Sequence, residues 1–171
     1  MKHIRVLVTG AGSIVGQGII KCLRHSKLSI HTIATDIAPL NAALFRADEG
    51  HIMPRVEAPG ALEEIIQVVR KIQPDVLMIG SEFDLLFFSE NKELIEAETG
   101  AQIIVSPPSV VRLAHDKFAT VKFLEEHDLP HAPAIAGVDT ETMCNWATHR
   151  GFPLILKPRQ GTSARHVHIV K

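Results

Sequence analysis

Short apolar runs alternate with segments of helical periodicity along the first part of the chain. Four runs are rich in β-branched residues and carry few charges, at 4–9, 29–35, 75–80 and 101–105. Such runs are typical of strands that are buried on both faces of a parallel sheet. The alternation predicts βαβ units and therefore a Rossmann-like, doubly wound α/β domain.

The segments between these runs are predicted to be mainly helical. Residues 61–72 place their apolar side chains at helical spacing, so that one face can be buried, and Pro74 ends the helix. The glycine-rich turn at 10–18 is followed by a helical stripe made of Ile19, Ile20, Leu23 and Leu28. Residues 85–98 are predicted to be mostly helical. Residues 39–54 have weak periodicity, which predicts a loop with a short helix.

The tripeptide Ser106-Pro107-Pro108 interrupts the alternation and predicts a domain boundary. We therefore expect one domain at 1–106 and a second at 107–171. The second domain is predicted to contain helices at 109–114, 116–127 and 140–149, and strands at 154–157 and 165–170. The sequence stops at Lys171, before the strand that begins at 165 would be complete, so we expect only the opening part of the second domain.

A cluster of glycines follows the first predicted strand and opens a helix. Gly10, Gly12 and Gly16 permit a tight turn, let backbone N–H groups approach a ligand, and let the helix pack closely on the sheet. Asp36 ends the second strand, where a dinucleotide-binding domain places its ribose acceptor. The same glycines would build the first crossover of any doubly wound domain, so an NAD-type site and a structural turn remain equal alternatives.

Composition excludes several classes of function. The 18 basic residues nearly balance the 19 acidic ones, so no electrostatic footprint for nucleic acid or a membrane surface exists. No secretory h-region and no apolar run of about 20 residues is present, which predicts a cytoplasmic protein. The opening VLVTGAG resembles the short-chain dehydrogenases, but the sequence contains no tyrosine for their Tyr-x-x-x-Lys pair.

The cysteines and histidines favour no metal or redox site. Cys22 and Cys144 stand far apart and belong to no CxxC pair, which indicates reduced, small apolar residues. His166 and His168 would share one face of a strand. No carboxylate or cysteine accompanies them, so a polar strand face is the preferred interpretation over a chelating pair.

Three motifs of the second domain point to one family. Asp116-Lys117 opens a helix, 129–133 reads Leu-Pro-His-Ala-Pro, and 151–158 reads Gly-Phe-Pro-Leu-Ile-Leu-Lys-Pro. With these motifs the sequence resembles the ATP-grasp superfamily, which includes carboxylate–amine ligases and carbamoyl-phosphate synthase-like proteins. The resemblance covers essentially the whole chain. It implies a pre-ATP-grasp domain followed by the first, truncated subdomain of an ATP-grasp α+β fold.

The resemblance also implies an ATP site in the second domain. Lys157 would leave a strand beside a glycine-bearing turn, and Lys117 would supply a second cation to the polyphosphate. The candidate ATP-binding residues are Lys117, Lys157, Arg159, Gly161, Thr162 and Ser163. Ala164 and Arg165 stand where the family usually has more glycine, which predicts a stiffer phosphate loop.

The substrate is expected at the first domain, outside the carboxyl ends of its strands. The candidate substrate-binding residues are Gly10, Gly12, Ser13, Ile14, Asp36 and Glu82. For Glu82, and for Asp84 beside it, a solvated helix start is the slightly preferred alternative, because acids are favoured there in any case.

We therefore expect the N-terminal part of an ATP-dependent ligase that activates a carboxylate as an acyl phosphate and transfers it to an amine. Its cofactors would be ATP and, in the complete protein only, Mg²⁺, so the 171 residues should be inactive alone. Its partners would be small-molecule carboxylates and amines, with no nucleic acid or membrane, and self-association is left open. An NAD(P)-binding oxidoreductase-type protein and a non-enzymatic sensor are the alternatives.

Overall fold

The computed structural model describes residues 3–161 and 164–171. The chain divides into two compact units, Met1–Pro108 and Ser109–Lys171, and each is described by itself. The first unit is an α/β domain around a parallel sheet, so the predicted fold class is confirmed.

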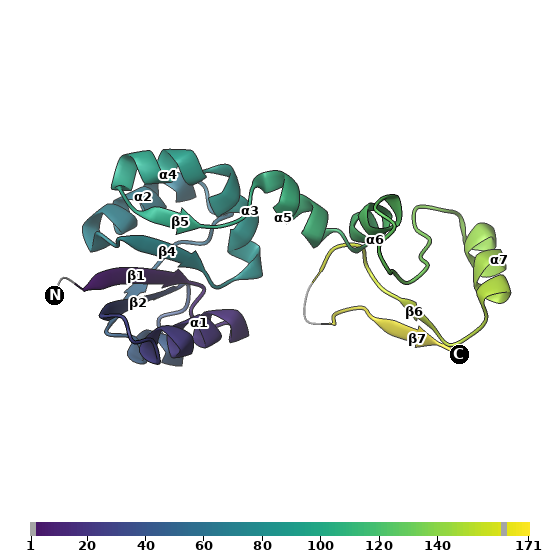
Figure 1. Ribbon diagram of the computed structural model, residues 1–171, viewed down its shortest axis with the longest axis horizontal. Helices are drawn as coiled ribbons and strands as arrows, with labels where there is room; N and C mark the ends of the chain where they lie inside the picture. Colours follow the sequence, from purple (N-terminus) through teal and green to yellow (C-terminus); the bar gives the residue numbers. More distant parts are fainter. Residues whose placement is uncertain (1–2, 162–163) are drawn as a thin grey trace. The chain divides into compact units, whose positions relative to one another are not determined.

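The sheet of the first unit has five strands in the order β3-β2-β1-β4-β5, and every neighbouring pair is parallel (Figure 1). The strands are β1 (Ile4–Thr9), β2 (Ile30–Asp36), β3 (Glu49–Ile52), β4 (Val76–Ile79) and β5 (Gln102–Ile104). The direction of winding reverses between β1 and β4. In open α/β sheets this reversal leaves a crevice at the carboxyl ends of the strands, which is where ligands bind.

Helices cover both faces of this sheet. The helical elements of the first unit are α1 (Ile14–Arg24), η1 (Ala42–Phe45), α2 (Ala61–Ile72), α3 (Glu82–Glu90) and α4 (Lys92–Thr99). Successive side chains of β1 point to opposite faces. Val6 and Val8 pack in the cluster that contains Ile20 of α1, whereas Leu7 packs in the cluster that contains Ile65 of α2. Both layers are therefore filled by apolar contacts between the sheet and its helices.

The structure corrects three predictions in this unit. Residues 39–54 contain β3, an edge strand that is too short and polar to show an apolar run. Helix α1 begins at Ile14, inside the predicted turn, and ends before Leu28. The helical segment predicted at 85–98 is two helices that meet at Asn91.

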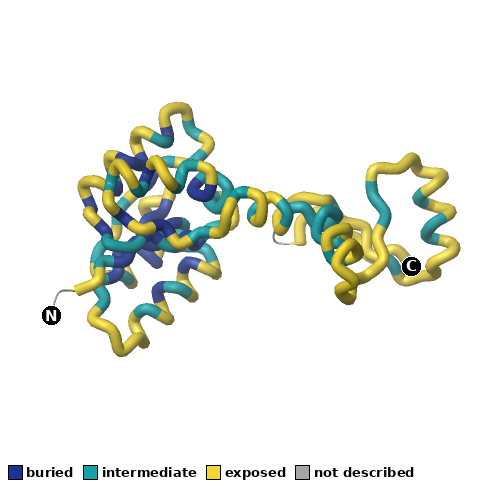
Figure 2. The backbone as a smooth tube through the Cα atoms, turned by 45° about the horizontal axis from the view of Figure 1, so that its top comes forward, coloured by how far each residue is buried: buried dark blue, intermediate teal, exposed yellow. Residues whose placement is uncertain are grey.

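The second unit has little buried surface of its own. It contains α5 (Pro108–His115), which begins at the last residue of the first unit, α6 (Lys117–Glu126), α7 (Thr140–Arg150) and the antiparallel pair β6 (Leu154–Leu156) and β7 (His168–Val170). Among its described residues none is buried, in contrast to the first unit (Figure 2). Strand β7 is shorter than predicted. His166, with φ of 57°, lies outside it, so His166 and His168 do not share a strand face.

Candidate functional site

A cavity of about 440 Å³ opens at the carboxyl edge of the parallel sheet. Its walls come from the ends of β1 and β2, from the segment after β3, and from α3. The lining residues are Thr9, Gly10, Gly12, Ser13, Asp36, Ile37, Asn41, Met53, Pro54, Arg55, Val56, Glu57, Ser81, Phe83, Asp84 and Phe88. The volume is within the range of pockets for small molecules.

Four of the six predicted substrate residues line this cavity, namely Gly10, Gly12, Ser13 and Asp36. The other two do not. Ile14, the first residue of α1, is 91% exposed, and Glu82 is exposed at the start of α3. The glycine turn and the end of β2 are thus brought together, as their places in the sequence indicated.

Close packing accounts for glycine at two positions of this turn. Gly10 has φ of 50°, and a Cβ there would lie 2.3 Å from the Ser81 Cβ. A Cβ on Gly16 would lie 2.5 Å from the carbonyl oxygen of Gly10. No L-residue with a side chain fits either position without a shift of the backbone. The turn therefore needs these glycines whether or not a ligand binds.

Ser13 and Asp36 hold the turn by hydrogen bonds. Ser13 Oγ accepts from the N–H of Gly16 at 2.8 Å, which caps α1, and donates to the carbonyl oxygen of Gly80 after β4. The carboxylate of Asp36 accepts from the N–H of Gly12 at 2.8 Å and from the N–H of Ala38 at 3.1 Å. Asp36 is thus engaged with backbone in this structure, at the position where a dinucleotide-binding domain holds a ribose.

The acid of α3 that faces the cavity is Asp84 and not Glu82. Thr9 Oγ1 donates a hydrogen bond to Asp84 Oδ2 at 2.8 Å. Burial raises the pKa of Asp84 above its usual value; the Thr9 hydrogen bond opposes this shift, and the charges of Glu57 and Asp36 add to it. The two acids are two residues apart on a helix, so their side chains point in different directions. The positions of the apolar residues Leu85 and Phe88 along α3 mark the side of the helix that faces the domain. This pattern could have distinguished Asp84 from Glu82.

In the second unit, Asp116 caps α6 and pairs with Arg159. Asp116 Oδ1 accepts from the N–H groups of Phe118 at 2.9 Å and Ala119 at 3.1 Å. Arg159 donates from Nε to the same oxygen at 3.1 Å and forms an ion pair with Oδ2. The Arg159 hydrogen bond and the backbone donors lower the pKa of Asp116 to about 2. The carboxylate therefore stays charged and anchors Arg159 at the start of α6.

Three predicted ATP-binding residues converge at this helix start. The backbone N–H of Lys117 donates to the carbonyl oxygen of Arg159 at 3.0 Å, and its Nζ donates to the carbonyl oxygen of Gly161 at 2.8 Å. The Arg159 guanidinium also lies 5.5 Å from the centre of the Phe118 ring. Lys157 follows β6 and is exposed. Thr162 and Ser163 lie outside the described residues.

No metal centre is formed by the residues that the structure describes, since no three His, Cys, Asp or Glu side chains gather in a way that could hold an ion. Cys22 and Cys144 are free thiols at exposed positions. None of the described helices combines the length and the apolar character that a membrane span requires.

Comparison with known proteins identifies relatives for most of the chain. Residues 6–104 match the family described as PylC-like, N-terminal domain. The carbamoyl-phosphate synthase of Methanobrevibacter smithii is 28% identical over 127 residues, which is 72% of this chain and 32% of that protein. The arginine-specific carbamoyl phosphate synthase large chain of Cutaneotrichosporon cutaneum is 26% identical over 90% of this chain and 14% of its own length. The chain thus spans about a third or less of these curated relatives.

Solved structures share the fold over nearly the whole chain. The biotin carboxylase domain of the Hydrogenobacter thermophilus 2-oxoglutarate carboxylase superposes with a TM-score of 0.68 and 20% identity, covering 99% of this chain and 38% of that one. The N5-carboxyaminoimidazole synthetase of Staphylococcus aureus superposes with a TM-score of 0.67 and 16% identity, covering 100% and 42%. At these identities the likeness shows the fold.

Proposed function

The chain belongs to the family of PylC-like N-terminal domains, and on this basis we propose that it forms the N-terminal part of an ATP-dependent carboxylate–amine ligase of the ATP-grasp superfamily. The first unit is the pre-ATP-grasp domain, and the second is the beginning of the ATP-grasp domain. The carbamoyl-phosphate synthases to which the chain is similar are several times longer, so the complete ligase would contain further segments.

The convergence of Lys117, Arg159 and Gly161 is the observation that carries this proposal. Lys117 lies more than forty positions before Arg159 and Gly161 in the sequence. Lys117 belongs to one of the three motifs that resemble ATP-grasp proteins, and Arg159 and Gly161 directly follow another, at 151–158. In the ATP-bound protein, Lys117 and Lys157 would place ammonium groups against the polyphosphate, and Arg159 would stay anchored on Asp116. The Staphylococcus and Hydrogenobacter proteins with the same fold were solved with ADP, which supports a nucleotide at this fold.

Mg²⁺ fits the described residues poorly, so no step is assigned to it here. Asp116 directly precedes Lys117 at the start of α6, and both its oxygens are engaged by Arg159. Metal ligands would have to come from other segments of the complete ligase. The 171 residues alone should therefore release no ADP from ATP.

We assign the small-molecule substrate to the cavity at the carboxyl edge of the sheet. Gly12 and Ser13 form one wall, and Asp84 and Glu57 supply acidic groups on the other side. A cytoplasmic setting belongs to the same proposal.

Nuclear magnetic resonance titration with ATP–Mg²⁺, NADH and NADPH separates this function from the alternatives. With ATP, we expect saturable amide shifts at Lys117 and at 159–161. Lys157→Met should weaken this binding, whereas Lys122→Met, which removes an exposed lysine of α6, should not. Saturable shifts at 10–16 with NADH, and none with ATP, would overturn the proposal in favour of a dinucleotide-binding protein. An absence of saturable amide shifts with ATP–Mg²⁺, NADH and NADPH would favour a non-enzymatic sensor.

A further inference from the structure

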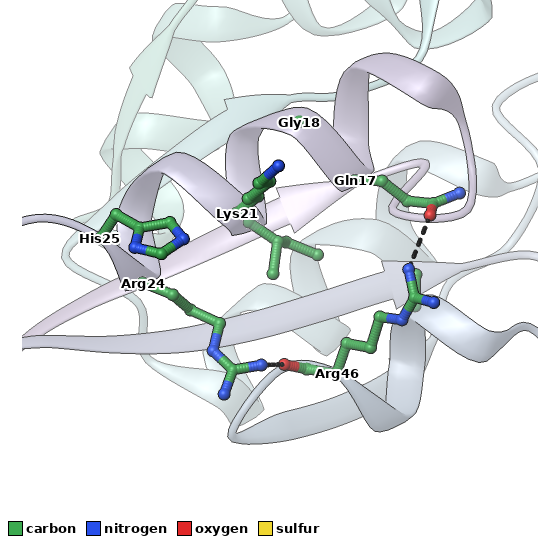
Figure 3. Close-up of a pocket in the computed structure, with 8 residues that line it drawn as sticks. Gln17, Gly18, Lys21, Arg24, His25 and Arg46 are labelled. Atoms are coloured by element: carbon green, nitrogen blue, oxygen red, sulfur yellow. Dashed lines mark hydrogen bonds between the residues drawn. The ribbon is translucent and has the colours of Figure 1, made fainter.

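A second cavity lies between α1 and η1, and its walls are basic. It has a volume of about 540 Å³ and lies away from the substrate cavity, with no lining residue in common. The polar face of α1 provides Lys21, Arg24 and His25, and Arg46 comes from the end of η1 (Figure 3). Ile20 and Ala43, both buried, line it as well.

No acidic residue lines this cavity, although the whole chain has a net charge of −1. Lys21 and Arg24 are three residues apart in the last turn of α1, so their charges lie close together on the helix surface. Asp48 lies near Arg24, but its Oδ2 accepts hydrogen bonds from the N–H of Thr32 at 2.8 Å and from Thr32 Oγ1 at 2.7 Å. The walls of the cavity therefore carry an excess of positive charge, although the Asp48 carboxylate outside them offsets part of the charge of Arg24, and such a concave surface concentrates anions.

The two guanidinium groups are held in place before any ligand arrives. Arg46 donates to Gln17 Oε1 at 3.0 Å, and Arg24 donates to the carbonyl oxygen of Arg46 at 3.0 Å (Figure 3). Gln17 is itself fixed, because its Nε2 donates to the carbonyl oxygen of Gly12 at 3.0 Å. Each arginine has five N–H donors and uses few of them in these contacts. Prior ordering of this kind lowers the entropic cost of binding a ligand.

Gly18 adds an independent observation. It lies within α1, where glycine is less favourable than alanine, and it lines the cavity. A Cβ built on Gly18 would meet no atom within 4 Å, so packing does not require glycine here. The missing side chain leaves space in this part of the cavity lining, which a ligand that approaches the helix would need.

We propose that the cavity between α1 and η1 binds a small phosphate-bearing anion, which Arg24, Arg46 and Lys21 would hold. Phosphate oxygens match the planar donor fork of arginine, and the volume accommodates an anion up to the size of a nucleotide. The ligand could be a free inorganic phosphate species or a phosphorylated metabolite. The chemistry of recognition is the same for both.

The test is a titration of the whole chain with inorganic pyrophosphate at 150 mM salt, followed by amide shifts, with ADP titrated in parallel. We expect saturable shifts along 17–25 and 43–46. Arg24→Gln and Arg46→Gln should each weaken binding about tenfold. Gly18→Leu should abolish binding, because the leucine side chain would fill the cavity beside α1. Lys71→Gln, an exposed lysine on α2 at the other face of the sheet, is the control and should change nothing.

Each of the other possible results either supports or overturns the proposed phosphate site between α1 and η1. ADP shifts at the same residues, with the same dependence on Arg24 and Arg46, support the site and identify a phosphorylated metabolite as an acceptable ligand. Pyrophosphate shifts without ADP shifts support it for inorganic phosphates. An absence of saturable shifts with either probe, or equal weakening in Lys71→Gln, overturns it. Thermal melting of each variant confirms that a loss of binding is not a loss of folding.

Discussion

Thr9 Oγ1 donates a hydrogen bond to Asp84 Oδ2 across 75 residues of sequence, and this contact joins the end of β1 to the first turn of α3. Thr9 is buried, and Asp84 lines the cavity at the carboxyl edge of the sheet. This hydrogen bond links β1 to α3 at the carboxyl edge of the sheet. The Asp84 carboxyl group that accepts it is largely shielded from water.

Asp84→Asn should stabilise the protein at neutral pH. Because burial raises the folded-state pKa of Asp84, the folded protein holds this proton more tightly than the unfolded chain. Stability is then lost as the pH rises from the unfolded value of 3.8 through the raised pKa. Asparagine can still accept the Thr9 hydrogen bond without a charge. The melting temperature of the variant should exceed that of the parent at pH 7, and the two should converge below pH 4. A variant that melts lower at pH 7 would contradict this.

Glu49→Gln should destabilise the protein at neutral pH, in contrast to Asp84→Asn. Hydrogen bonds from His51, His31 and Arg5 lower the pKa of Glu49 to about 2. A lowered pKa stabilises the folded state above the unfolded value of 4.5, and this stabilisation disappears as the pH falls towards 2. The group is about one-third exposed, so solvent screening limits the loss in Glu49→Gln to about 1 kcal/mol.

Denaturant unfolding across the acid range measures this effect. The difference in free energy of unfolding between the parent and Glu49→Gln should be at its maximum at pH 6 and should fall to zero between pH 4.5 and pH 2. Glu63→Gln, an exposed acid of α2, serves as the control. A gap that is constant with pH would mean that the carboxylate charge is not the cause.

Gly80→Ala should be strongly destabilising, whereas Gly18→Ala should be mildly stabilising. A Cβ on Gly80 would lie 2.3 Å from the Thr9 carbonyl oxygen and 2.7 Å from the Gly16 Cα. Since the backbone of two elements would have to shift, we expect a loss of about 1–3 kcal/mol. At Gly18 the same added methyl meets open space, and alanine should gain about 0.5–1 kcal/mol through helix propensity. Equal effects in paired chemical denaturation curves would contradict the close packing of α1 on the sheet.

Lys157→Met and Lys117→Met should both weaken ATP binding by the complete ligase, by about tenfold to a hundredfold, with Lys157 the more important. Only Lys117→Met should also loosen the segment at 159–161, because Lys117 Nζ donates to the Gly161 carbonyl oxygen. Calorimetric titration with ATP–Mg²⁺ measures the first effect, and amide exchange at Gly161 measures the second. Unchanged affinity in a well-folded Lys157→Met variant would remove Lys157 from the site.

Local patterns in the sequence were sufficient for the framework of the first unit. Buried parallel strands are apolar and β-branched, and a helix on a sheet repeats its apolar face, so β1 and α2 have the predicted bounds. The edge strand β3 escaped prediction because pairing with β2, and not an apolar run, makes it a strand. The glycine turn and Asp36 were both candidates for a substrate site outside the carboxyl ends of the strands, and both line the same cavity.

Tertiary structure decided which side chains meet. Glu82 and Asp84 are two residues apart in the sequence, but only the packing of α3 turned Asp84 toward the cavity and Thr9. Similarly, no spacing rule predicts that Arg159 pairs with Asp116 forty-three residues earlier. Periodicity describes how one element meets its surroundings. Contacts between distant residues depend on the relative rotation and offset of two elements, which packing alone determines.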